Sequence, residues 1–198
     1  MKKTIFILAL LFILPMAAQK NEATLYFRDG TVLEGFAKIS QRAFSVKIKF
    51  RKKIGAKKIF YTSKELEYFK IKKRENNKIS IRTYWYKKIS GDSYTLLEQK
   101  EKGKVNLFVL FQVNHSSMPG PNGPIMTSSS ISSYYVAKEN EESLTHLGSK
   151  GSLFGKNFKK AASEYFRDCP ELVKKIQDKE YRKKHIEKVV KYYNENCN

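Results

Sequence analysis

The N-terminal two-thirds of the chain alternates apolar and polar residues with the two-residue period of half-buried β-strands. The clearest stretch is residues 44–50, FSVKIKF, in which four apolar residues enclose Ser45, Lys47 and Lys49. One face of this strand is therefore expected to be apolar and the other to carry lysines. Asp29-Gly30 is a tight-turn dipeptide between two further alternating stretches, 23–28 and 31–39, and predicts a hairpin.

More strands are predicted further along the chain, at residues 57–61, 67–73, 78–87, 94–99, 104–113 and 132–138. Residues 105–113 are apolar on both faces, which is typical of a covered central strand. Residues 115–130 contain three prolines and two glycines followed by serines, so we expect a loop without regular structure there.

The apolar period changes to that of a helix after residue 157. Apolar residues follow the i, i+3, i+4, i+7 spacing twice, at 158, 161, 162 and 165 and again at 186, 189, 190 and 193. A shorter helix is predicted between them, because Pro170 suits a first helical turn and Asp168 with Glu171 resembles a capping pair. The predicted fold class is α+β: an antiparallel β-rich body (meander, sandwich or open barrel) over residues 20–150, then about three helices over residues 151–198.

The first nineteen residues have the three-part layout of a secretory signal peptide. Lys2 and Lys3 precede an apolar run from Ile5 to Leu14, and small residues follow at Ala17 and Ala18. The alternatives are a single N-terminal anchor helix and a buried core helix, and the run is shorter than the roughly 20 residues that span a bilayer. We therefore expect an exported protein that is periplasmic, outer-membrane-associated or extracellular, with no transmembrane segment in the mature chain.

The two cysteines extend the apolar stripes of two predicted helices. Cys169 lies four residues after Tyr165, and Cys197 lies four residues after Tyr193. A disulfide is expected because an exported chain meets an oxidising compartment. Two buried free thiols or a metal pair are the alternatives, and neither cysteine has a second Cys or His at metal-ligand spacing.

The charge of the chain is strongly positive and unevenly distributed. There are 39 Lys and Arg against 19 Asp and Glu, and without Lys2 and Lys3 the net charge is +18. Residues 42–74 hold 13 basic residues against Glu65 and Glu67. A surface of this kind attracts anions in a salt-dependent way. The candidate binding residues for an anionic partner are Lys47, Lys49, Lys52, Lys53, Lys57, Lys58, Lys70 and Lys72.

These lysines have two interpretations. They form a binding surface, or they only keep sheet edges soluble and unpaired. Export argues against nucleic acid as the partner, so anionic envelope lipid or polysaccharide is the expected partner.

The residues that usually carry catalysis do not form a motif in this sequence. His115, His146 and His185 stand apart from one another, and there is no paired metal-ligand spacing, nucleophile elbow or phosphate-binding loop. We predict no metal and no cofactor. His115, beside the Pro/Gly segment, is the one polar ring considered for a catalytic role.

Three short segments carry a resemblance to known proteins. Residues 165–172 (YFRDCPEL) and 192–197 (YYNENC) resemble a recurrent ending of secreted β-rich proteins of Gram-negative bacteria, and residues 27–31 (FRDGT) resemble their opening. The resemblance implies export and implies no activity.

The sequence thus favours a non-enzymatic binding or scaffold protein of the cell envelope with a basic surface. The alternatives are an envelope enzyme of hydrolase type with a site between sheet and helices, which needs a pocket holding His115 and a carboxylate, and a carrier of an apolar ligand, which needs a cavity inside the sheet.

Overall fold

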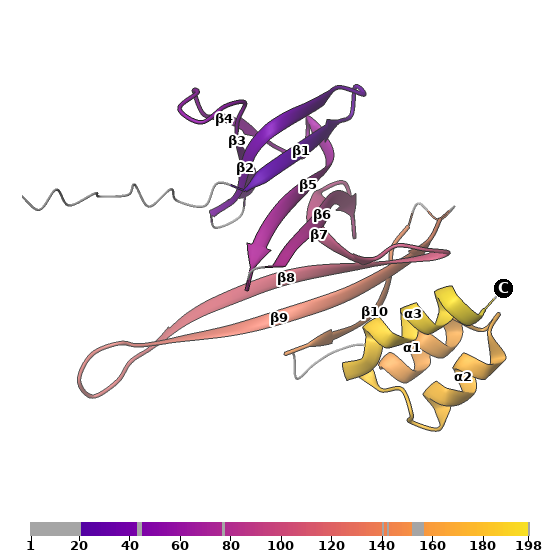
Figure 1. The fold of residues 1–198 in the computed structure, drawn as a ribbon. Coiled ribbons are helices and arrows are strands. Elements are labelled where there is room, and N and C mark those ends of the chain that lie inside the picture. The colour runs from indigo at the N-terminus through magenta and orange to yellow at the C-terminus, as the bar shows by residue number, and fades with distance from the viewer. Residues whose placement is uncertain are drawn as a thin grey trace, which may run out of the picture.

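The computed structural model describes residues 21–42, 45–76, 78–139, 141, 143–151 and 157–197. Within these residues one antiparallel sheet of ten strands is followed by three α-helices (Figure 1). The predicted fold class, an antiparallel β-rich body with a C-terminal helical subdomain, is confirmed. The predicted signal peptide, residues 1–19, lies outside the described residues.

The sheet consists of two antiparallel meanders that meet where β1 pairs with β5. In space the strands run β10-β9-β8-β7-β6-β5-β1-β2-β3-β4. Their bounds are β1 Glu22–Phe27, β2 Val32–Arg42, β3 Ser45–Arg51, β4 Ile59–Tyr61, β5 Leu66–Glu75, β6 Lys78–Lys88, β7 Tyr94–Glu101, β8 Val105–Met118, β9 Ile125–Lys138 and β10 Thr145–Lys150.

The predicted first hairpin forms for the expected local reason. Asp29 Oδ1 accepts a hydrogen bond from the Thr31 amide at 2.9 Å. Gly30 has a φ of +85°, which an L side chain adopts only with strain. The turn joins β1 to β2 in an antiparallel register that places Leu25 opposite Leu33.

Two clusters of buried residues lie on the same face of the sheet. The first is formed within the sheet by β1, β2, β3, β5 and β6, with Leu25, Phe50 and Phe69 at its centre. The second lies between β8, β9 and β10 and the helices, and includes Leu107 and Phe166. The chain thus has a core made by the curled sheet and a second core made by helices covering the sheet's other end (Figure 1).

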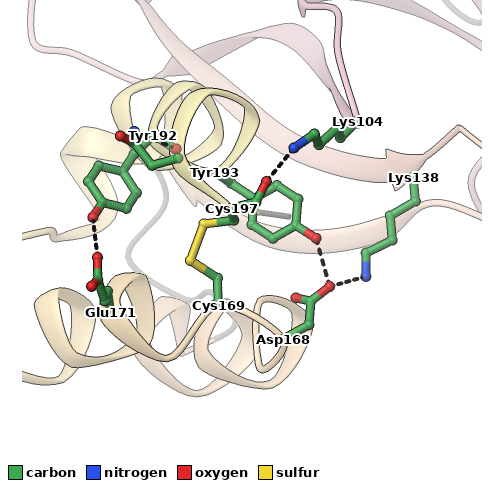
Figure 2. The surroundings of a disulfide bond; sticks show 9 residues. Lys104, Lys138, Asp168, Cys169, Glu171, Tyr192, Tyr193 and Cys197 are labelled. Atoms are coloured by element: carbon green, nitrogen blue, oxygen red, sulfur yellow. Dashed lines mark hydrogen bonds and ion pairs between the residues drawn. A yellow bond between two sulfur atoms is a disulfide. The ribbon is translucent and has the colours of Figure 1, made fainter.

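The helical subdomain has three α-helices and a short 3₁₀ turn. The bounds are α1 Phe158–Tyr165, α2 Pro170–Gln177, the 3₁₀ turn Lys183–His185 and α3 Ile186–Asn196. Cys169 and Cys197 are both buried and are joined by a disulfide (Figure 2). The predicted disulfide is therefore present, and it ties the start of α2 to the end of α3.

A side-chain clamp attaches α3 to the first residue of β8. The Asn194 amide donates to the Val105 carbonyl at 2.9 Å, and its oxygen accepts from the Val105 amide at 2.8 Å. The clamp needs a glycine beside it, because a Cβ on Gly103 would lie 2.6 Å from the Asn194 side chain. Asn194 thus supplies both hydrogen bonds that a neighbouring strand would give to Val105.

The segment predicted as a loop, residues 115–130, is mostly strand, so that prediction was wrong. β8 continues to Met118 and β9 begins at Ile125, in unbroken register, and only residues 119–124 form the turn. The prolines and glycines occupy just this turn. The flanking serines and Thr127 fit an extended hairpin, where Ser116 and Thr127 hydrogen-bond across the strands at 2.6 Å.

Two smaller predictions also need correction. The strand at residues 105–113 is covered only as far as Val109, because Phe111 and Val113 are 59% and 44% exposed. The predicted capping pair of α2 does not form. Pro170 does occupy the first turn, but the N-cap residue is Cys169, and Asp168 instead bonds to Lys138 and Tyr193.

Candidate binding face on the outer side of the sheet

We use "outer face" for the side of the sheet opposite the helices and both buried clusters. Strand alternation and register define it. On β3, Lys47 and Lys49 alternate with buried Ile48 and Phe50, and Lys49 lies opposite Lys38 of β2. The same face continues across β1 at Thr24, which lies between β2 and β5.

The eight candidate lysines divide between two strands and one loop. Lys47 and Lys49 lie on β3, and Lys70 and Lys72 lie on β5. The other four, Lys52, Lys53, Lys57 and Lys58, are exposed in the β3–β4 connection. Thr24 lies opposite both Glu34 and Lys70. Glu34 shares its strand face with Lys38, which lies opposite Lys49, so the lysines of β3 and β5 are on the same outer face.

The electrostatic environment of β3 is positive. The pKa of Lys49 is lowered, first by the neighbouring charge of Lys58 and then by slight desolvation and the charges of Arg51 and Lys38. An anion bound here would relieve this repulsion. Lys38 was not among the residues selected from the sequence, since its position opposite Lys49 depends on strand pairing.

A hollow of about 470 Å³ opens on the outer face where β1, β2, β5 and β6 lie side by side. Lys52, Lys70 and Lys72 line it together with Ile81 and two carboxylates, Glu22 and Glu34. Lys72 pairs with Glu22 at 2.9 Å, so part of the positive charge is already balanced.

Large apolar side chains are exposed among these lysines. Ile81 of β6 is 68% exposed and lies opposite Lys72. Phe60 of β4 is 50% exposed and lies opposite Lys49. Ile54 is 67% exposed in the β3–β4 connection. The lysines of β3, of β5 and of the β3–β4 connection therefore each have an exposed apolar residue beside them that can contact a partner.

A row of aromatic rings crosses the outer face. Tyr26 stacks on Tyr68 with ring centroids 4.2 Å apart and planes 9° apart, and Tyr68 stacks on Trp85, also at 4.2 Å. Tyr68 therefore has both flat faces covered by other rings, whereas Tyr26 and Trp85 each have one face covered. The Trp85 indole N–H donates to Gln99 at 3.0 Å.

Lys87 continues this row toward β8. Its Nζ lies 5.4 Å from the Trp85 ring centroid and 5.2 Å from that of Phe108. Burial lowers the pKa of Lys87, and the charge of Glu67 opposes that effect. The sequence analysis did not select these residues. Trp85 and Lys87 share a strand face at alternating spacing, but the rings beside them come from strands whose order the sequence does not reveal.

A second hollow, of about 830 Å³, lies beside α1, where the predicted enzyme alternative would place its site. Lys138 donates to Asp168 at 2.7 Å, and the Tyr193 hydroxyl donates to the same carboxylate oxygen at 2.7 Å (Figure 2). Nearby, the Tyr165 hydroxyl donates to Glu141 at 2.7 Å. Burial first, and then the Glu141 carboxylate, raise the pKa of Tyr165, so this phenol stays protonated.

His115 is not in this hollow. It lies on the exposed part of β8 opposite Ser128, and no residue lining the hollow is a histidine. The pocket with His115 and a carboxylate that the enzyme alternative requires is therefore not formed by the described residues.

None of the described helices combines the length and apolarity that crossing a bilayer requires. Fold and outer face together define a class: an antiparallel β-sheet protein with a disulfide-closed helical cover and a basic, partly apolar sheet face. Comparison with protein-family models, curated proteins and solved structures finds no match for this chain. The resemblance of its C-terminal segments to secreted Gram-negative proteins therefore stays a prediction.

Proposed function

We propose that the protein is an exported, non-enzymatic binding or scaffold protein of the cell envelope whose outer face docks on an anionic lipid surface. The observation that carries the proposal is the mixture of lysines and exposed apolar side chains on one sheet face, where Ile81 lines the same hollow as Lys52, Lys70 and Lys72. Peripheral membrane binding combines these two contributions, apolar burial in the interface and attraction to anionic headgroups.

The arrangement of the aromatic rings favours lipid over polysaccharide. A sugar ring packs on the flat face of an aromatic side chain, and here both faces of Tyr68 and one face each of Tyr26 and Trp85 are covered by another ring. Lys70 and Lys87 lie over the rings of Tyr26 and Trp85, with Nζ 5.5 Å and 5.4 Å from the ring centroids. Ring edges with polar tips suit the headgroup region, where Trp and Tyr are enriched.

The carrier alternative has less support. The two hollows described above open to solvent and are lined by several charged residues, whereas a site for an apolar ligand is enclosed and mostly apolar.

Vesicle binding tests the proposal directly. Trp85 is the single tryptophan of the chain and lies on the proposed contact face, so its fluorescence reports docking. We expect binding and a blue shift with vesicles containing phosphatidylglycerol, weaker binding at high salt, and none with phosphatidylcholine alone.

Two sets of variants separate the contributions of charge and apolar contact. Replacing Lys52, Lys70 and Lys72 by Gln should weaken vesicle binding about a hundredfold, at roughly 1 kcal/mol per lysine near the surface. The matched control replaces the exposed helix lysines Lys174, Lys184 and Lys188 by Gln, with the same change in net charge.

Ile81→Ser should weaken vesicle binding about tenfold, since its side chain would no longer be buried in the interface. Ile125→Ser, also at an exposed isoleucine but at the turn end of the β8–β9 hairpin and not among the residues that line the hollow, is its control. Equal losses in the outer-face and control sets would refute the proposal. Binding to an acidic polysaccharide such as polygalacturonate, without vesicle binding, would assign the face to a glycan instead.

A further inference from the structure

The hairpin formed by the ends of β8 and β9, residues 110–131, extends from the body as an arm (Figure 1). Its composition is unlike that of the rest of the chain. The 33 consecutive residues 105–137 contain no Asp, Glu, Lys or Arg, in a chain in which 29% of residues are charged. Most residues of the arm are Ser, Thr, Asn or apolar.

Both edges of the arm lack a neighbouring strand in the described part of the chain. β7 pairs with β8 only as far as Val109, which leaves nine residues of β8, 110–118, with one open edge. β10 pairs with β9 from Ser132 onward, and Gly151 lies against Ser130, so the open edge of β9 is shorter. Proteins usually protect such edges with charged side chains, proline or bulges, and residues 110–118 have none of these.

The arm also receives no support from either core. No described residue between 110 and 131 belongs to a buried cluster, and Phe111, Val113 and Met126 are exposed. A two-stranded hairpin by itself is marginally stable in water. A partner strand along the arm would supply the missing hydrogen bonds and cover these apolar side chains.

We propose that this partner is a second copy of the same chain, paired antiparallel through the open edge of β8 about a two-fold axis. The distribution of charge is the reason for choosing a second copy as the partner. The whole chain has a net charge of +20, so two copies repel one another wherever their basic surfaces meet, and the arm offers a long contact with no like charges.

The open edge is also self-complementary, as a two-fold interface requires. Pairing that uses all of residues 110–118 places Asn114 on the axis, opposite its own copy. Leu110 then lies opposite Met118, so apolar side chains meet apolar side chains at both ends.

Sedimentation velocity over a range of protein concentrations tests association. We expect a monomer–dimer equilibrium whose affinity increases with salt, because salt screens the repulsion between the basic bodies. Vesicle docking has the opposite salt dependence and does not involve the arm, so failure of one proposal is distinguishable from failure of the other. A chain that is monomeric at every concentration and salt level would overturn this proposal.

Two asparagines of the arm provide a matched pair of variants. Asn114→Lys places like charges directly opposite on the axis and should weaken association by about tenfold or more. Asn122→Lys adds the same charge to the exposed turn and should leave association nearly unchanged. Equal effects of the two substitutions would contradict pairing through β8.

Cross-linking gives an independent geometric test. Both native cysteines are consumed by the Cys169–Cys197 disulfide, so a new cysteine has no native thiol to react with. Asn114→Cys should form a covalent dimer under mild oxidation, because opposed residues of paired strands lie within disulfide reach. Asn122→Cys should form no covalent dimer, and equal cross-linking at both positions would overturn the proposed register.

Discussion

Asp168 shows how one side chain connects elements that are distant in sequence. It lies just before α2, accepts hydrogen bonds from Lys138 of β9 and Tyr193 of α3, and so joins the sheet to two helices (Figure 2). Burial alone would raise the pKa of Asp168, but these two hydrogen bonds outweigh it, and the pKa lies below its usual value of 3.8.

This lowered pKa predicts a specific contribution to acid stability. A carboxyl group whose pKa is lower in the folded state stabilises the protein above its unfolded-state pKa, and the contribution is lost as the pH falls through the folded-state pKa. Asp168→Asn should therefore destabilise the protein at neutral pH and flatten the fall in stability below about pH 4. The measurement is urea unfolding at a series of pH values.

The control for this series is Asp178→Asn, at an exposed carboxyl group that follows α2. The effect of Asp168→Asn should be modest, since the Lys138–Asp168 pair is more than a third exposed and is screened by solvent. An unchanged acid slope in Asp168→Asn would show that the pair does not contribute to it.

At the residue scale, sequence periodicity correctly predicted those features that depend only on residues close together in the chain, such as the strand face on which a side chain lies. The two-residue alternation correctly put Lys47 and Lys49 on the face opposite Ile48 and Phe50. It could not predict the partners of Asp168, because Lys138 and Tyr193 come from distant elements. A local capping role was therefore the only one that the sequence suggested.

At the scale of elements, the disulfide is the main covalent constraint on the helices. It closes a loop with a sequence separation of 28 that contains all of α2, the 3₁₀ turn and all of α3. In the chain-entropy model a loop of this length stabilises the folded state by roughly 3 to 4 kcal/mol.

Replacing Cys169 and Cys197 by Ser should reduce the free energy of unfolding of the helical subdomain by about that amount. Hydrogen exchange followed by mass spectrometry measures this by comparing peptides of α2 and α3 with peptides of β1 and β5. Reduction of the wild-type chain should reproduce the effect. A similar loss of protection in β1 and β5 would contradict a local role for the disulfide.

The pairing of elements was harder to predict than the elements themselves. Strands and helices were found because each has its own period, and the two cysteines lie on the buried stripes of their helices. The neighbour relation of β1 and β5 was not foreseeable, since nearly forty residues separate them. That relation places Lys70 and Tyr68 beside Thr24 and Tyr26, so much of the candidate face depends on it.

The long β8–β9 hairpin was missed for a different reason. Serine and proline clusters usually mark loops, and here the prolines are confined to residues 119–124 while the serines lie in strands. Cross-strand pairing, which a local pattern does not report, decides the structure of such polar segments.

At the scale of the whole molecule, the two buried clusters lie on one continuous sheet but are otherwise separate. The connection between them runs through β7 and β8, whose register has only three paired positions and an irregularity after Gln99. By contrast, fourteen positions pair β8 with β9. The junction between the two cores is therefore only weakly paired, and we expect the two cores to unfold as separate units.

Paired substitutions test this expectation. Phe166→Ala in the helical core and Phe69→Ala in the sheet core should each destabilise their own core by about 3–5 kcal/mol, since both rings are fully buried. Hydrogen exchange should then increase only in the core that carries the substitution. Equal acceleration of both cores by either variant would indicate one cooperative unit.

The Asn194 clamp also makes the protein sensitive to chemical ageing. Asparagine is among the thermolabile residues, and hydrolysis of its amide converts it to aspartate. The product has only acceptor oxygens and would direct one of them at the Val105 carbonyl, which now receives a hydrogen bond. Conversion of this one amide to a carboxylate hardly changes the mass of the chain, but it would replace a hydrogen bond between α3 and β8 by electrostatic repulsion.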